Sequence, residues 1–90
     1  MTQKIKDLLD ERYEWPCEYQ FKFIIKDLGK EGEVKGIFQA DLPDRTAIFM
    51  EKLSRTGKYK SLSVKAEMRS SSEVMSFYQK VGSIEGIMSL

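Results

Sequence analysis

One short stretch in the second half of the chain concentrates side chains that could bind a charged ligand. Three cations, two serine hydroxyls and a phenol surround a glycine, at Lys52, Ser54, Arg55, Gly57, Lys58, Tyr59 and Ser61. The cations could bind an anion or a carboxylate, because their side chains are charged hydrogen-bond donors. The same composition is typical of a β-hairpin in which Gly57 supplies a positive φ, and this simpler interpretation is favoured. The candidate ligand-binding residues here are Lys52, Ser54, Gly57, Tyr59 and Ser61.

Residues for catalysis are missing from the sequence. The chain contains no histidine, which is the commonest general base, and no asparagine. Nucleophile activation by histidine is therefore excluded, as is the arginine–asparagine pair that acylphosphatases use. Carboxylates are plentiful, but none lies in an apolar setting that would raise its pKa toward neutrality. We expect no catalytic residues and no enzymatic activity.

Metal and redox chemistry are limited by a single thiol. Cys17 is the only cysteine, so it cannot form a disulfide within the chain. One thiol without histidine cannot build a closed transition-metal site. We expect no metal, no cofactor and a cytoplasmic location, where thiols stay reduced.

The size and charge of the chain describe an ordinary globular domain. Its 90 residues suffice for one hydrophobic core, with 41% hydrophobic and 32% charged residues. The net charge is +1 and the opposite charges are interspersed, which does not favour a dedicated nucleic-acid module. No apolar run approaches the length of a membrane span, and we expect no membrane partner.

Apolar residues alternate with polar ones in several segments, which predicts β-strands. The clearest alternation places Leu62, Val64, Ala66 and Met68 on one face of a strand. Such a pattern is typical of an antiparallel sheet with one covered face. Strands are expected over 18–26, 46–54 and 61–68, with a short last strand that includes Ile84, Ile87 and Leu90.

Helical spacing of apolar residues predicts three helices, over 1–13, 30–39 and 71–81. The last one has the strongest start signal, because Ser70 and Glu73 can form a capping box in which each side chain binds the other residue's amide. Gly82 is expected to end this helix. The first helix is extra to the core, and we expect Ile5, Leu8 and Leu9 to pack on the domain itself.

The order of these elements predicts an α+β fold. After the first helix the order is β-α-β-β-α-β, which is typical of a ferredoxin-like sandwich with a four-stranded antiparallel sheet and two helices on one face. We expect a single domain over 1–90, with the ferredoxin-like core at 18–90.

The chain resembles the YbeD-like family of small bacterial proteins of unknown function. The resemblance rests on Trp15-Pro16, on the pattern Lys52-x-Ser54-x-x-Gly57-x-Tyr59-x-Ser61, and on Tyr78-x-x-Val81-Gly82. It implies a ferredoxin-like fold close to the ACT-type regulatory domains, which bind amino acids beside metabolic enzymes. In those domains the ligand lies at the junction of the first strand and helix, where this chain has Asp27 and Gly29. A lone Asp-x-Gly usually forms only a turn, and both residues are kept as minor candidates.

The most favoured function is a non-enzymatic regulatory or adaptor module that binds a small metabolite or a protein partner. One alternative is a single-stranded nucleic-acid binder, but the outward face of the third strand offers only Tyr59 for base stacking. Another alternative is an accessory subunit of a metabolic enzyme. The predicted open face of the sheet is too polar for an obligate interface, so we expect a monomer or a weak homodimer.

Overall fold

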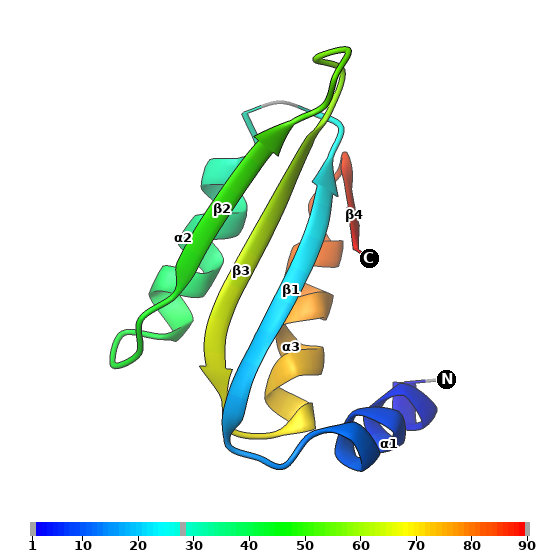
Figure 1. The fold of residues 1–90 in the computed structure, drawn as a ribbon, viewed down its shortest axis with the longest axis vertical. Coiled ribbons are helices and arrows are strands. Elements are labelled where there is room, and N and C mark those ends of the chain that lie inside the picture. The colour runs from blue at the N-terminus through cyan, green and yellow to red at the C-terminus, as the bar shows by residue number, and fades with distance from the viewer. Residues whose placement is uncertain (1, 28, 90) are drawn as a thin grey trace.

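The computed structural model describes residues 2–27 and 29–89, and it has an α+β fold. Its elements are α1 (Thr2–Arg12), β1 (Cys17–Ile25), α2 (Glu31–Asp41), β2 (Ile48–Leu53), β3 (Lys60–Met68), α3 (Ser71–Gly82) and β4 (Ile87–Ser89). The four strands form one antiparallel sheet in the order β2-β3-β1-β4. Figure 1 shows α2 and α3 behind this sheet. We call the opposite side of the sheet, which is turned toward the viewer, the open face.

The register between β1 and β3 decides which side chains enter the core. The two strands pair over their full length, from Cys17 opposite Met68 to Ile25 opposite Lys60. Directly opposed residues share a face of the sheet. Phe21 therefore lies beside Val64 on the helix side, and both side chains are fully buried.

Aromatic rings fill the space between the sheet and the two helices. Phe38 of α2 stacks on Phe77 of α3, with ring centroids 4.4 Å apart and planes 2° from parallel. Phe21 of β1 meets both rings edge-on, at 5.0 and 5.8 Å. Burying each such ring stabilises the fold by roughly 2–3 kcal/mol, so the aromatic residues of β1 hold the two helices on one face.

The helix α3 begins as the sequence predicts, but its capping box is only half formed. The Ser70 hydroxyl accepts a hydrogen bond from the Glu73 amide at 3.1 Å. The Glu73 carboxylate does not return to the Ser70 amide; it accepts from the Arg69 amide at 2.8 Å. The prediction was wrong on this point because Arg45 also binds the Glu73 carboxylate and fixes its position.

Gly82 ends α3, as the sequence predicts, but without a left-handed conformation. It is the last helical residue and its φ is not positive, and the following Ser83 still has helical angles. The positive φ occurs at Gly86, just before β4. A β-carbon at Gly86 would lie 2.8 Å from that of Asp27, so this close approach needs the glycine.

The predicted element boundaries shift by a few residues. The helix expected over 30–39 runs to Asp41, because Leu42 is buried and still donates to the Phe38 carbonyl. The strand expected over 46–54 covers only Ile48–Leu53. Ile84 precedes β4 and packs against the core. Leu90, assigned to the last strand, lies outside the described residues.

The helix α1 packs on its own domain. Leu9 lies against the core, while Ile5 and Leu8 remain about half exposed. Trp15 donates from its indole nitrogen to the Asp10 carboxylate at 2.9 Å, which fixes the connection to β1. Across residues 2–27 and 29–89, no helix has the length and apolar character needed to cross a membrane.

A nearly buried ion pair joins three parts of the fold. The Arg45 side chain is 10% exposed and donates to both oxygens of Glu73, each at 2.7 Å. It also donates to the Glu67 carbonyl at 2.8 Å. The hydrogen bonds from Arg45 are the main cause that lowers the pKa of Glu73. The pair therefore ties the loop before β2 to α3 and to the end of β3.

Replacing Ser70 should weaken the start of α3. Ser70→Ala removes the acceptor for the Glu73 amide and should destabilise the protein by about 1 kcal/mol. Urea unfolding measures the change. Ser72→Ala, at an exposed position of the same first turn, is the matched control. Equal losses in the two variants would refute a capping role for Ser70.

At acid pH Glu73 should no longer contribute to the stability of the fold. Because its folded-state pKa is lowered, the stabilisation is present above the unfolded pKa of about 4.3 and is lost as pH falls through the folded value. Glu73→Gln should cost about 2 kcal/mol near pH 7 and should flatten the rise of stability with pH in the acid range. Urea midpoints from pH 3 to 7 test this, with the exposed Glu85→Gln as control. If the urea midpoint of Glu73→Gln rose with pH as steeply as that of the unsubstituted protein, this explanation would be wrong.

Candidate functional site

A hollow of about 450 Å³ lies on the open face, where the β2–β3 hairpin begins. We call it the sheet-end hollow. Its lining residues are Lys22, Lys52, Leu53, Ser54, Arg55, Tyr59 and Ser61. Three segments contribute: β1, the end of β2 with its turn, and the start of β3. Figure 1 shows this hairpin extending beyond the other strands.

Strand register brings the polar side chains of this hollow together. Lys52 lies directly opposite Ser61, and Lys22 lies opposite the next outward residue of β3, Ser63. Opposed residues share a face, and the neighbouring Leu62 points into the core. Lys22 and Lys52 therefore both stand on the open face, on either side of β3.

The hairpin is fixed by its own hydrogen bonds. The Ser54 amide donates to the Tyr59 carbonyl at 2.8 Å, and the Ser54 hydroxyl accepts from the Tyr59 amide at 3.2 Å. Gly57 donates to the Ser54 carbonyl at 3.0 Å with a φ of 73°. The Ser61 hydroxyl lies 3.4 Å from the Lys52 carbonyl, within donating reach. The serines and Gly57 thus build the turn that positions the cations.

The cations of the sheet-end hollow are not neutralised by the protein. Within the described residues, Lys22, Lys52 and Arg55 form no ion pair, and no carboxylate lines the hollow. On the helix side the opposite holds: Lys60 lies between Glu31 and Glu51, at 3.4 and 3.2 Å. Like charges gathered around a concave surface raise the local concentration of anions.

The predicted candidates Asp27 and Gly29 lie outside this hollow. The Gly29 amide donates to the Glu31 carboxylate at 2.8 Å, and the Lys30 amide donates to the Asp27 carbonyl at 3.2 Å. Hydrogen bonds from the Glu31 and Gly29 amides lower the pKa of Glu31. The protein's own carboxylate therefore occupies the position at the start of α2 where a ligand carboxylate would bind. These residues form a structured turn.

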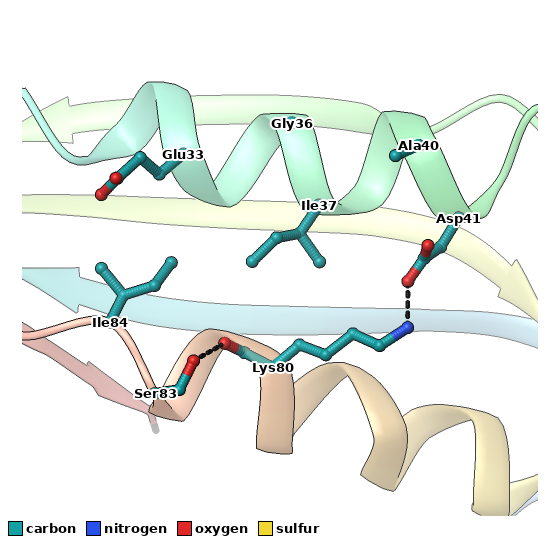
Figure 2. A pocket seen from close by; sticks show the side chains of 8 residues that line it. All are labelled: Glu33, Gly36, Ile37, Ala40, Asp41, Lys80, Ser83 and Ile84. Carbon is teal, nitrogen blue, oxygen red and sulfur yellow. Dashed lines mark hydrogen bonds and ion pairs between the residues drawn. The ribbon is translucent and has the colours of Figure 1, made fainter.

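A second hollow, of about 590 Å³, lies between α2 and α3 on the helix side (Figure 2). Ile37 and Ile84 line it, and Lys80 closes one end by an ion pair with Asp41. Glu33 at the other end pairs with Lys30 at 3.3 Å. Since its charges are already paired, this hollow offers less for an ionic ligand than the sheet-end hollow does.

The pKa shifts of Glu51, Tyr78 and Cys17 lead away from neutrality. Hydrogen bonds from Lys35 and Lys60 lower the pKa of Glu51, so its carboxylate stays ionised at neutral pH and is a weak base. Burial raises the pKa of Tyr78, whose hydroxyl lies 3.0 Å from that of Tyr19. Burial also raises the pKa of the Cys17 thiol. Residues 2–27 and 29–89 contain no group of three His, Cys, Asp or Glu side chains that could hold a metal ion.

The sequence predicts most of the residues that line the sheet-end hollow, but it does not predict the contribution of β1. Lys52, Ser54, Tyr59 and Ser61 were named together, and all line it. Gly57 shapes the turn without lining the hollow, and the proposed anion ligand Lys58 is absent from the lining. Lys22 was missed as a member because only the pairing of β1 with β3 brings it there.

These features define a small α+β domain with a cationic hollow on the open face of its sheet. Residues 10–90 match the family described as protein of unknown function (DUF493), and the chain belongs to this family. The predicted YbeD-like resemblance is thereby confirmed.

A solved structure supports the fold. The solution structure of protein HP0495 from H. pylori is similar, with a TM-score of 0.64 and 21% sequence identity. The match covers 91% of this chain and 92% of that one. None of the curated proteins matches this chain.

Replacement by alanine should change the stability of the protein in opposite directions at two of its glycines. Gly57→Ala should destabilise by about 1 kcal/mol, because its positive φ disfavours a β-carbon although the site has space. Gly36→Ala, in the interior of α2 with nothing within 4 Å, should stabilise by about 0.5–1 kcal/mol. Thermal unfolding of both variants measures this. A loss at Gly36 equal to that at Gly57 would refute the backbone explanation.

Proposed function

We propose that this protein is a non-enzymatic regulatory or adaptor domain that holds an anionic group, a carboxylate or a phosphate, in the sheet-end hollow. The observation that carries this proposal is the cluster of Lys22, Lys52 and Arg55 around one hollow with no acidic partner among the described residues. Unpaired cations gathered at a concave surface are disposed to bind an anion from solution.

The hydrogen-bonding groups of the hollow suit a planar or tetrahedral oxyanion. Arg55 offers a guanidinium fork, which matches two oxygens at once, and the lysines add point charges. The Tyr59 hydroxyl can donate a further hydrogen bond from the rim, where this side chain is 45% exposed. A volume of about 450 Å³ suits a small metabolite or one side chain of a partner protein.

Several observations support binding rather than catalysis. The chain contains no histidine, and no carboxylate lines the sheet-end hollow. A general base is therefore missing from the place where a ligand would lie. The lowered pKa values of Glu31, Glu51 and Glu73 reflect structural pairing on the helix side. A cytoplasmic setting, suggested by the single cysteine, is part of this proposal.

We also propose that the fold is ferredoxin-like and related to the ACT-type domains. The strand order β2-β3-β1-β4, with α2 and α3 on one side, supports a ferredoxin-like arrangement. The ligand site differs from the ACT-type expectation, since the junction at Asp27 and Gly29 is filled by Glu31. The proposed ligand therefore lies on the opposite face of the sheet from the helices.

Titration of the protein with inorganic phosphate and with citrate tests the proposal. At low ionic strength we expect saturable amide shifts confined to Lys22 and residues 52–61. Lys52→Gln and Arg55→Gln should each weaken binding about tenfold, because a charge-assisted hydrogen bond is worth about 1.5 kcal/mol. Added salt should weaken it further.

Lys58→Gln is the matched control, since Lys58 lies in the same hairpin but does not line the hollow. Binding that falls equally in Lys58→Gln, or shifts that never saturate, would show that the anion responds only to overall charge and would refute a site.

A further inference from the structure

The open face carries apolar side chains that no described element covers. Ile48 and Met50 of β2 are 52% and 55% exposed, and Met88 of β4 is 45% exposed. Register places all of them on the open face, because Met50 lies opposite Ser63 and Met88 lies opposite Ile24. A sheet face that served only as solvated surface would not need this set of aliphatic and thioether side chains.

Cations stand beside the apolar residues of β2, from the hairpin to just past the middle of β3. Lys65 lies opposite Ile48, and Lys22 is aligned with Met50 across β3. Together with Lys52 of the sheet-end hollow, these cations form no ion pair within the described part of the chain. This part of the face therefore combines exposed apolar surface with lysines that no ion pair neutralises.

The far end of the same face is acidic. Glu18 and Glu67 lie directly opposite each other there, an arrangement that is unfavourable between like charges. The charge of the face thus changes sign along the strands, from positive at the hairpin to negative at the end near α1. An acidic segment of a partner is therefore favoured beside Lys22, Lys52 and Lys65 and disfavoured beside Glu18 and Glu67.

A second copy of the chain fits this face poorly. The face carries more cations than acids, so two copies would meet with like net charge and would bury unmatched lysines. Nucleic acid also fits poorly, because bases stack on aromatic rings. The rings of β1 at Phe21 and Phe23 are buried on the helix side, and Tyr59 stands alone at the hairpin.

We propose that the open face docks an acidic amphipathic helix of a partner protein. Its apolar side chains lie on Ile48 and Met50, and its carboxylates lie at Lys22, Lys65 and the sheet-end hollow. This inference rests on the proposed function, since one carboxylate of the helix is the anion that the hollow receives. Methionine side chains adapt their shape to such apolar faces.

The dimensions of a helix match those of this face. Ile48 and Met50 are two residues apart on a strand, which separates them by about 6.8 Å. Residues four apart on a helix are separated by about 6 Å along its axis, so consecutive apolar positions of the partner meet consecutive outward residues of β2. Beside Met50 and Lys52 the outward side chains of β3 are the short Ser63 and Ser61, which leave room for the helix.

A synthetic peptide tests the inference. The probe is a labelled helical peptide of about 16 residues with leucines along one side and glutamates flanking them. Two control peptides replace every glutamate by glutamine or every leucine by serine. We expect the probe to bind at least about tenfold more tightly than either control, with fluorescence anisotropy as the measurement.

Variants of the protein locate the binding. The double variant Ile48→Ser, Met50→Ser should weaken peptide binding about tenfold and leave phosphate binding unchanged, whereas Lys52→Gln should weaken both. Leu8→Ser is the matched control, because Leu8 is 48% exposed on α1, away from this face. The substituted side chains are exposed, and unchanged melting temperatures confirm that the variants are folded.

The outcomes are distinguishable. Phosphate binding without peptide binding would overturn this inference and leave the proposed function standing, while the loss of both would overturn both. Tighter binding of a single-stranded oligonucleotide than of the peptide, through the same residues, would assign the face to nucleic acid instead. Self-association that the Ile48 and Met50 substitutions abolish, measured by light scattering, would assign it to a second copy.

Discussion

The pairing of β1 with β3 is the constraint on which the rest of the molecule depends. Side chains alternate between the two faces of a strand, so a shift of one residue would exchange every inward and outward position. In the observed register Phe21 and Phe23 meet Val64 and Leu62 on the helix side. The helices α2 and α3 dock on the surface that these residues create, through the stacked rings of the core. The same register sets Lys22 on the open face.

Charge is distributed unequally between the two faces of the sheet. On the helix side and its margins, cations have partners: Lys60 contacts two glutamates, and Arg45 forms a bidentate pair with Glu73. These pairs fix loops and helix ends to the sheet. On the open face, Lys22 and Lys52 have no such partners within the described residues. Carboxylates therefore neutralise cations on the helix side, whereas the hairpin end of the open face stays positive, which is the physical basis for the anion-binding proposal.

The accuracy of the sequence predictions depended on the range of the interactions involved. The alternation of Leu62, Val64, Ala66 and Met68 predicted the buried face of β3, and the structure buries all of them. Gly57 was assigned a positive φ from its local context, and it has one. The partner of Glu73 was missed because Arg45 is distant in sequence and comes from a loop without regular periodicity. Gly82 was correctly expected to end α3. The positive φ at Gly86 was missed because the close approach to Asp27 that requires it joins residues distant in sequence.

The sequence by itself determined the local structure: which segments are strands or helices, where the hairpin turns, and that the chain has no histidine for catalysis. These properties follow from periodicity, capping and turn chemistry, which act between residues near one another in the chain. Only the tertiary structure decided that Lys22 joins Lys52 around one hollow and that Met50 stands exposed beside them. The physical reason is that strand order and register arise from the burial of apolar residues that are distant in sequence. The outward side chains take their positions from this register, although they are not themselves buried.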